Sequence, residues 1–549
     1  MSKNISHLSG RQGLKNNLFE KIGHLSEHEG TLSKEQKIGL AEEYLIGKAN
    51  ITGTISAYDF TREENRGKKA YVCNGSACLL AGTQDAVREK LGKHLKEEEI
   101  GNMTCLGRCH ENSAFNFNGT NYSALSDADF DEVMQNKKPK TDNYYVDHNG
   151  LQILTGDFPG LDTFYTTLKD SLAEGPDAVL QKIKNSGVRG RGGAGFSMGF
   201  KLEACKNEPG NEKYIVCNAD EGDPGAYSDR YLLEQQPHLV IFGMIAAGYA
   251  VGANWGVIYT RAEYPESVDI VQNALDQLYD LNILGENIMG SDFSYDLKVV
   301  KGLGAYICGE ETALLNSLEG QRPEVRTRPP YPTQQGLFNK PTVVNNVETL
   351  ATLHYILTHT GKKYAEHGTE KSTGTKLVCL DSFFNRPGMY EVEMGTPLRT
   401  VIDEMGQGFK QPVKALHIGG PLGGLVPMSK IDNLSIDFES FAQEGFLLGH
   451  ASVICIPEEY PLVQYIEHLF EFTAHESCGK CFPCRLGSTR GKEMFQKAQT
   501  EGYKMDRELL DDLIDTMERG SLCALGGGVP LPVKNALQYF EDELKQYFN

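Results

Sequence analysis

Apolar positions in the first 65 residues recur with a helical period among many polar side chains. Ser33 and Gln36 form the two ends of a capping box just before this pattern begins. The apolar residues that follow lie mostly on one helical face, namely Ile38, Leu40, Ala41, Tyr44 and Leu45. The pattern therefore predicts an N-terminal helical segment over residues 1–65.

From about residue 151 to residue 360 the pattern changes, and β-rich runs alternate with helical runs and glycine-dense turns. This alternation is typical of an α/β sheet. Within it, residues 239–259 are nearly all apolar over about the length of a membrane span, but residues 252–256 interrupt them. We expect a buried helix followed by a buried strand there, and no membrane anchor.

Short strand-like pieces with glycine turns follow from about residue 375 to residue 437, and the last hundred residues have a helical pattern. Near the N-terminus, a strand at 71–73 precedes an amphipathic helix at 83–95. Together the patterns predict a helical segment followed by four domains, with bounds 1–65, 66–140, 150–365, 370–440 and 441–549.

Composition narrows the class of protein. A chain of 549 residues is too long for one core, so three or four domains are expected. The formal net charge of −20 leaves no basic stripe for phosphates, which argues against a nucleic-acid partner. The thirteen cysteines do not resemble a disulfide framework, and the start lacks the apolar core of a secretory signal. We therefore expect a protein of the reducing cytoplasm.

One cysteine set has the spacing Cys478-x2-Cys481-x2-Cys484, with Cys523 about forty residues later. Three thiolates on one tight loop and a fourth from elsewhere in the fold suit a [4Fe–4S] cluster. A structural zinc, which more often uses two CxxC pairs or a Cys/His mixture, and reduced structural cysteines are the alternatives. A cluster here implies transfer of single electrons.

A second set consists of the pairs Cys73/Cys78 and Cys105/Cys109, separated by 26 residues. Four cysteines on two loops suit a [2Fe–2S] cluster, although the spacing is not that of a plant-type ferredoxin. Zinc is the main alternative, but its usual pairs are two residues apart.

Five glycines fall within residues 187–195, in the run GVRGRGGAG. Such a run lets backbone N–H groups turn toward a phosphate without obstruction by side chains. It is not the GxGxxG fingerprint, and it lacks the Walker lysine-hydroxyl pair, so an ATPase is unsupported. Taken alone, a flexible turn explains it as well.

Three polar segments accompany the glycine loop, and their side chains suit ribose hydroxyls and flavin edges. Solvated turns and helix caps are the alternatives, the second because paired carboxylates favour a helix N-terminus. The residues are Asn218, Asp220, Glu221, Asp223, Glu310, Glu311, Asn345 and Asn346.

The motifs GVRGRGGAGF, CNADEGDPG, GAYICGEETALLNSLEG, KPTVVNNVETLA and ESCGKCFPCRLG occur in this order over roughly seven-tenths of the chain. Together they closely resemble the NADH-binding flavoprotein subunit of respiratory complex I and its soluble relatives. The four-cysteine unit before them resembles the thioredoxin-like [2Fe–2S] domain, which complex I carries on a separate subunit. Its fusion to the flavoprotein is similar to the diaphorase subunit of NAD(P)-linked, often electron-bifurcating, hydrogenases and of some formate dehydrogenases.

The resemblance implies an α/β multidomain protein with a thioredoxin-like [2Fe–2S] domain, a Rossmann-like FMN/NAD domain, a ubiquitin-like β-grasp insert of the SLBB type and a helical [4Fe–4S] domain. The implied FMN contacts are Gly190, Arg191, Gly192, Gly193, Lys201, Asn218, Asp220, Tyr306, Glu310, Asn345 and Asn346. The implied contacts of the nicotinamide dinucleotide are Phe196, Glu221, Asp223, Glu311, Arg328 and Tyr331. No side chain is expected to act as an acid or base on the hydride.

The chain also departs from the family. Residues 202–204 are Leu-Glu-Ala where the family often has Trp-Ser-Phe, so one aromatic for adenine stacking is missing. Asp223 replaces a usual glutamate, and Arg328 replaces a common lysine. No further ferredoxin-like cysteine run follows Cys523, which weakens the case for electron bifurcation.

We therefore expect hydride transfer between NAD(P)H and FMN, then transfer of single electrons through the clusters. Carboxylates near the adenosine ribose, with Asp223 and Glu221 as candidates, favour NAD(H) over NADP(H). Expected partners are a small thioredoxin-like [2Fe–2S] subunit, a catalytic iron–sulfur subunit of hydrogenase or formate dehydrogenase type and, through the complex, ferredoxin. The alternatives are a component of a complex I-type NADH dehydrogenase and, in another class, a zinc-bearing scaffold with a decayed nucleotide site.

Overall fold

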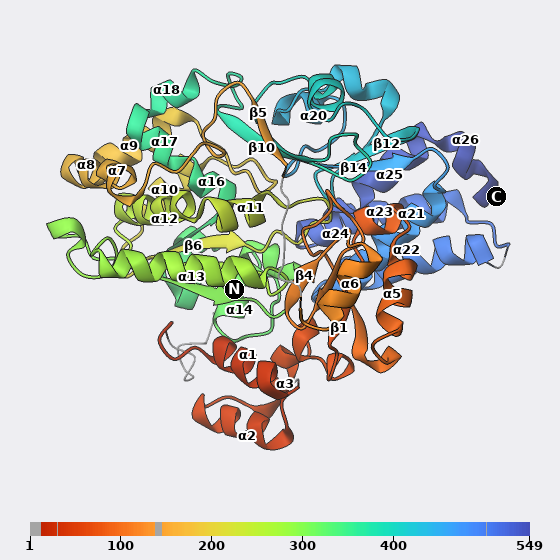
Figure 1. Cartoon of the computed structure of the whole chain (residues 1–549), viewed down its shortest axis with the longest axis horizontal. Helices are drawn as coiled ribbons and strands as arrows, with labels where there is room; N and C mark the ends of the chain where they lie inside the picture. The colour runs from red at the N-terminus through yellow and green to blue at the C-terminus, as the bar shows by residue number, and fades with distance from the viewer. Residues whose placement is uncertain (1–12, 30, 138–144, 501) are drawn as a thin grey trace.

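The computed structural model describes residues 13–29, 31–137, 145–500 and 502–549. The first twelve residues and residue 30 of the predicted helical segment, and residues 138–140 of the predicted thioredoxin-like domain, lie outside the described residues. In Figure 1 the N-terminal helices lie at the bottom, the predicted flavin domain lies at the left and the C-terminal helices lie at the right.

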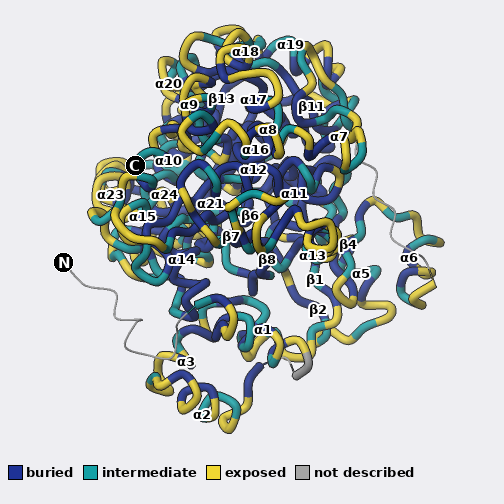
Figure 2. Tube along the Cα trace, turned by 90° about the vertical axis from the view of Figure 1, so that its left-hand side faces the viewer, coloured by how far each residue is buried: buried dark blue, intermediate teal, exposed yellow. Residues whose placement is uncertain are grey.

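A parallel sheet with the strand order β8-β7-β6-β9 is the framework of the predicted flavin domain. Its strands are β6 (Tyr214–Ala219), β7 (Trp255–Thr260), β8 (Asp296–Lys301) and β9 (Thr342–Asn346). Neighbouring residues of β6 enter different cores, because side chains alternate across a sheet. Ile215 packs on the face covered by α12 (Pro237–Val251), whereas Val216 packs on the opposite face. Figure 2 shows β6, β7 and α12 as buried in the centre of the molecule.

The N-terminal helices cover that opposite face of the sheet. They are α1 (Leu18–Glu29), α2 (Lys34–Glu43) and α3 (Lys48–Ile55), and the predicted capping box at Ser33 and Gln36 is confirmed. Leu18 and Phe19 share a core with strand residues, and the Asn17 side chain donates to the Leu318 carbonyl at 2.7 Å. The segment is thus packed onto the flavin domain, which the sequence pattern did not predict.

The long apolar stretch forms α12 followed by β7, which confirms the expected helix and strand. All but three of the fifteen residues of α12 are buried, because the helix lies between the parallel sheet and neighbouring helices. Within the described residues, no helix combines the length and the apolar character needed to cross a bilayer.

The thioredoxin-like region contains a second sheet with the order β2-β1-β3-β4. The strands are β1 (Ala70–Cys73), β2 (Ile100–Met103), β3 (Phe115–Phe117) and β4 (Thr120–Tyr122), and they pack with α5 (Gln84–Gly92) and α6 (Asp127–Met134). Because β1 and β2 are parallel neighbours, the loops at their carboxyl ends meet at one edge of the sheet.

A third sheet, with the order β13-β12-β14-β10-β11-β5, occupies the region of the predicted β-grasp insert. Four of its strands lie within the expected bounds, namely β10 (Thr375–Leu380), β11 (Gly388–Glu393), β12 (Val413–Ile418) and β13 (Gly424–Pro427). The other two, β5 (Val146–Asn149) and β14 (Ser452–Pro457), come from outside residues 370–440. We therefore propose that residues 452–457 belong to this unit and not to the C-terminal one.

The C-terminal unit is helical, as expected. Its main helices are α21 (Leu462–Glu476), α22 (Phe482–Thr500), α23 (Arg507–Gly520), α24 (Ala524–Gly528) and α25 (Pro530–Tyr539). Their apolar faces form a core that also includes Ile454 and Ile456 of β14. This packing fixes the turn between α21 and α22 and the start of α24 relative to the third sheet.

Candidate functional site: two thiol clusters beside a glycine-lined pocket

The structure brings the first cysteine set together. Cys73 ends β1, Cys78 lies on α4 (Ser76–Leu80), and the loop after β2 carries Cys105 and Cys109. The Sγ atoms of Cys105 and Cys109 are 3.4 Å apart, and the Cys73 thiol interacts with Cys78 and Cys105. All four are buried without a disulfide, which is a donor set that fits a [2Fe–2S] cluster.

The second set also converges. Cys478 and Cys481 lie in the turn between α21 and α22, Cys484 lies in the first turn of α22, and Cys523 caps α24. A Cβ atom at Gly526 would lie 2.5 Å from the Cys484 Cβ, so only glycine permits this approach of α24.

Burial raises the pKa of Cys484 to about 11 and that of Cys523 to about 12. The thiols are therefore protonated at neutral pH until a metal cluster binds them, and cluster insertion releases protons.

A cavity of about 320 Å³ lies between the glycine loop and the second thiol set. The carboxyl ends of the parallel strands β6 and β9 meet there, which is where open α/β sheets bind ligands. One wall is formed by Cys523, Ala524 and Leu525. The predicted residues that line the cavity are Gly192, Gly193, Asn218, Asp220, Glu221, Asp223, Tyr306, Glu310 and Asn346.

Other predicted residues form a charged rim next to this cavity. The Lys201 Nζ donates to the Val344 carbonyl at 2.6 Å and lies 3.4 Å from the Glu311 carboxylate. Arg328 pairs with Glu311 at 3.0 Å and also with Glu310. One chain of ion pairs therefore links two predicted FMN contacts, Lys201 and Glu310, with two predicted dinucleotide contacts, Glu311 and Arg328.

Three aromatic side chains from the glycine-loop and Arg328 segments are exposed. Phe196 is 53 % exposed and Tyr331 is 54 % exposed. Phe200, which the sequence motifs did not single out, is 60 % exposed and packs edge-to-face against Phe196, with ring centroids 5.6 Å apart. Phe200 directly precedes Lys201, a predicted FMN contact, and its exposure adds it to the candidate residues.

The structure does not place every predicted FMN contact in the cavity. Arg191 is fully buried, and its guanidinium donates to the Tyr364 hydroxyl and the Thr373 carbonyl instead of facing the cavity. The Arg191 backbone N–H donates to the Thr349 hydroxyl at 2.8 Å, so the contact of Arg191 with FMN stays a prediction.

Two further predicted FMN contacts are not among the residues that line the cavity. Asn345 is buried beside Asn346, and its Nδ2 has no hydrogen-bond partner among the described residues. The Gly190 N–H donates to the Phe196 carbonyl at 2.8 Å, so this amide closes the glycine loop on itself and does not face a ligand.

One buried arginine, Arg261, joins the cavity to the first thiol set. Its guanidinium donates to the carbonyls of Cys105 and Thr104, both at 2.8 Å, and to the Glu221 carbonyl at 3.1 Å. It also lies 3.4 Å from the Asp220 carboxylate. Sequence patterns did not indicate this role, because Arg261 follows a buried strand and matches none of the motifs.

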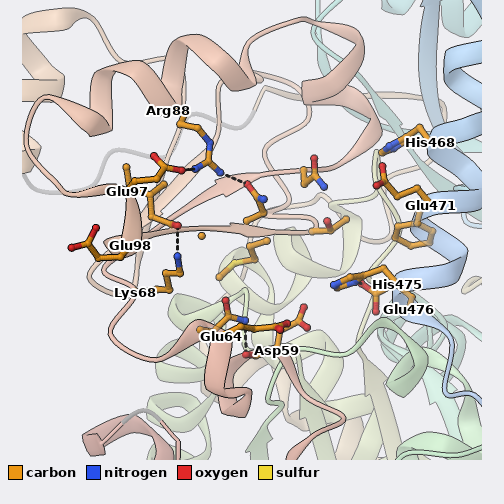
Figure 3. A pocket seen from close by; sticks show the side chains of 18 residues that line it. Asp59, Glu64, Lys68, Arg88, Glu97, Glu98, His468, Glu471, His475 and Glu476 are labelled. Atoms are coloured by element: carbon orange, nitrogen blue, oxygen red, sulfur yellow. Dashed lines mark hydrogen bonds and ion pairs between the residues drawn. The ribbon is translucent and has the colours of Figure 1, made fainter. Parts of the chain in front are cut away.

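A second cleft lies elsewhere in the molecule (Figure 3). It measures about 890 Å³ and lies between the thioredoxin-like region and α21. Asp59, His475 and Glu476 converge on it, with possible ligand atoms within 4.8 Å of one another. The Arg62 guanidinium pairs with Asp59 at 2.8 Å, so an arginine side chain already supplies a positive charge to this acidic group. The cleft is polar and does not contain the glycine loop.

Two converging thiol sets beside a glycine-lined pocket define a flavin- and iron–sulfur-binding electron-transfer protein. Comparison with protein families identifies three matching regions: a Nuo51 FMN-binding domain at residues 183–355, an NADH-ubiquinone oxidoreductase-F iron-sulfur binding region at 464–547 and a thioredoxin-like [2Fe-2S] ferredoxin at 6–138. The chain belongs to the family of NADH-quinone oxidoreductase F and related hydrogenase subunits. The chain is an oxidoreductase that binds FMN, a [2Fe–2S] cluster and a [4Fe–4S] cluster. This confirms what the resemblance implied.

Relatives of the chain occur in both hydrogenases and quinone reductases. The NADP-reducing hydrogenase subunit HndC of Solidesulfovibrio fructosivorans is 39 % identical over 70 % of this chain and 78 % of its own length. The NADH-quinone oxidoreductase F protein of Escherichia coli is 38 % identical over 67 % of this chain and 84 % of its own. A chain of the NAD+-reducing [NiFe]-hydrogenase in the H2-reduced state superposes with a TM-score of 0.86, at 28 % identity, over 97 % of this chain and 94 % of its own.

The cavity fits FMN on structural grounds. Gly193 has a φ of +128°, and a Cβ atom there would meet nothing within 4 Å, so the loop backbone is open. Near the end of β9, the buried Asn345 Nδ2 has no hydrogen-bond partner among the described residues. Donors of this kind suit the phosphate and ring edges of a flavin nucleotide.

Replacement of Arg261 by methionine tests the junction between the cavity and the first thiol set. We expect Arg261→Met to lower the free energy of unfolding by about 3–5 kcal/mol, because it leaves buried carbonyls and carboxylates without their cation. The urea midpoint of the holoprotein, followed by [2Fe–2S] absorbance, measures this loss. Arg399→Met, which removes a surface arginine paired with Asp432, is the matched control and leaves the midpoint unchanged. Equal midpoints in both variants contradict the assigned role.

Loss of one thiolate tests the second set. Cys481→Ser is expected to abolish the EPR signal of the [4Fe–4S] cluster while the [2Fe–2S] signal and the flavin absorbance remain, because the two sets lie on separate loops. Cys205→Ser, at a buried cysteine of α10 (Met198–Asn207) that belongs to neither set, serves as the control. An unchanged EPR spectrum in Cys481→Ser refutes the ligand assignment.

Proposed function

We propose that this chain is the nucleotide-oxidising flavoprotein subunit of an NAD(P)-linked hydrogenase or formate dehydrogenase, and that the predicted cavity, rim and cysteine residues bind its cofactors. The observation that carries the proposal is the shared wall of the cavity. Cys523, a member of the second thiol set, lines the same cavity as Gly192 and Gly193. A group bound on the glycine loop therefore lies directly beside the cluster ligands, which short-range electron transfer requires.

The residues have separate tasks in this proposal. The glycine loop, Asn346 and Lys201 hold the flavin nucleotide. Glu311 and Arg328 hold the dinucleotide together with the exposed aromatic side chains of Phe196 and Tyr331. FMN supplies the step from hydride to single electrons when it is bound. Leu422 and Leu525 line the cavity and exclude water from its inner wall. No side chain of the cavity needs to exchange a proton with the hydride.

The proposed assembly is soluble, cytoplasmic and made of several subunits. Its partners are a small thioredoxin-like [2Fe–2S] subunit, a catalytic iron–sulfur subunit and, through the complex, ferredoxin. The hydrogenase side of the family is favoured because the hydrogenase chain matches over 97 % of this chain, including the N-terminal [2Fe–2S] region. A complex I-type NADH dehydrogenase is the second candidate, supported by the relatives among the NADH-quinone oxidoreductases. Free, buried cysteines support a reducing compartment.

We propose NAD(H) as the preferred dinucleotide. Two carboxylates, Glu221 and Asp223, were expected to contact the adenosine ribose. The Glu221 carboxylate is buried and accepts a hydrogen bond from the Asp229 N–H at 3.0 Å. Asp223 has both oxygens engaged, by Tyr306 and by His450. Glu311 instead lies on the rim with Arg328 and Lys201, which makes it a third candidate for the contact that repels a 2′-phosphate.

Anaerobic titration of the purified holoprotein with NADH tests the function. NADH is expected to bleach the flavin absorbance and then reduce the clusters, followed by visible and EPR spectroscopy. A zinc-bearing scaffold would be colourless and show neither change. Co-purification with a hydrogen- or formate-activating subunit, or with other components of complex I, separates the two candidate assemblies.

The ratio of kcat/KM for NADH and NADPH tests the nucleotide preference. Asp223→Asn and Glu311→Gln each remove one negative charge and keep a hydrogen-bonding group. Removing the repulsion between this carboxylate and the 2′-phosphate is worth roughly 1–3 kcal/mol in a partly wet pocket. The variant that lacks the repelling carboxylate is therefore expected to use NADPH, relative to NADH, about tenfold better or more. A wild type that prefers NADPH, or two variants with the wild-type ratio, contradicts the proposal.

A further inference from the structure

His450 lies outside all of the recognised motifs, yet it lines the flavin cavity. It precedes β14, and its side chain is only 4 % exposed. The Nδ1 atom accepts from the Ser452 N–H at 3.3 Å, so the hydrogen-bond pattern assigns the ring proton to Nε2. Nε2 lies 2.9 Å from the Asp223 Oδ2, so the imidazole faces this carboxylate, whose charge raises the pKa of His450 above its ordinary value.

The other oxygen of Asp223 is held as well. The Tyr306 hydroxyl donates to the Asp223 Oδ1 at 2.5 Å. Gly420 closes the arrangement, because a Cβ atom there would lie 2.8 Å from both the Asp223 Cγ and the His450 Nε2. One carboxylate on the cavity wall is thus fixed by three segments, which come from the flavin domain and from the third sheet with its connections.

The surroundings keep the carboxylate charged. Burial raises the pKa of a carboxyl group, but the interactions with His450 and Tyr306 outweigh it and hold the pKa of Asp223 below its ordinary value. Glu221 faces the imidazole from the same loop, Lys376 faces it from β10 and His417 from β12. Of these groups, the Tyr306 hydroxyl donates a hydrogen bond to Asp223, and the His450 Nε2 lies within ion-pair distance of it.

We propose that His450 is a positioning residue that keeps Asp223 ionised and fixed on the cavity wall, and that this charge sets the reduction potential of the flavin. The inference rests on the proposed function, since it requires FMN in this cavity. Reduction adds electron density to the flavin, and a fixed negative charge beside it disfavours that change. The third sheet thereby tunes the cofactor of another domain through a single imidazole.

The midpoint potential of FMN in the holoprotein, measured by spectroelectrochemistry from pH 6 to pH 8, tests the inference. Asp223→Asn is expected to raise the potential, because it removes the charge. His450→Ala is expected to raise it in the same direction, and more at the acidic end, where an unsupported Asp223 takes up a proton. His450→Gln is expected to restore a potential near that of the wild type, because its amide N–H group reaches the same carboxylate.

Two combinations make the test specific. In the Asp223→Asn background, His450→Ala is expected to cause no further change, because the imidazole acts only through Asp223. His468→Ala removes another buried imidazole, which contacts Ser76 and not Asp223, and controls for a cavity of the same size. A potential in His450→Ala equal to that of the wild type at every pH overturns the inference, as does an equal shift in His468→Ala.

Folding and cofactor content are read from the same samples. Should His450→Ala fail to fold, His450→Asn replaces it, because the shorter amide cannot span the distance to Asp223; a wild-type potential in that variant overturns the inference equally. The affinity of the apoprotein for FMN, measured by quenching of flavin fluorescence, tests the proposed function separately from the role of His450. Failure of the wild type to bind FMN refutes the proposed function, whereas normal binding with unshifted potentials refutes only the role of His450.

Discussion

The buried guanidinium of Arg261 is the contact on which the arrangement of the site depends. It bonds to the loop that carries Cys105 and, on its other side, to the Asp220–Glu221 segment of the flavin cavity. Burial alone would lower the pKa of Arg261, but Glu263, Tyr264 and Asp220 raise it, so the group stays charged. A buried charge is costly unless hydrogen-bond acceptors or opposite charges surround it. The thioredoxin-like region and the flavin domain therefore fit together in one orientation.

This constraint places each thiol set against the cavity by a different route. On one side, the Gly225 N–H donates to the Cys109 Sγ at 3.2 Å, so the acidic loop contacts the first set directly. On the other side, Cys523 lines the cavity itself. Hydrogen bonds to ligand sulfurs and nearby charges tune cluster potentials. The short acidic loop after β6 thus acts on the flavin cavity and on the environment of one cluster at once.

Sequence patterns predicted the parts of the site that local chemistry determines. Cysteine spacing predicted both thiol sets, because each set contains cysteines that lie a few residues apart on one loop. The glycine run and the strand-end amides predicted a nucleotide site, because each is a short local pattern. Contacts between distant segments were not predictable in the same way. Arg191 belongs to the glycine motif but turns toward Tyr364, and β14 joins a sheet whose other strands precede it by many residues. Such outcomes depend on which surfaces meet after the chain has folded.

Two glycines, Gly526 and Gly420, matter because they let neighbouring backbone and side chains approach closely. Gly526 and Gly420 both occur in glycine-rich sequences. Each marks a close approach without room for a side chain, Gly526 between two helices of the C-terminal unit and Gly420 between the third sheet and the flavin domain. Gly526 brings α24 against Cys484, and Gly420 brings the third sheet against Asp223 and His450. Without these contacts the cluster wall and the carboxylate would lie farther from the cavity. Glycine thus shapes the site at two levels: Gly526 fixes the cluster wall within one unit, and Gly420 lets the third sheet reach the carboxylate of the flavin domain.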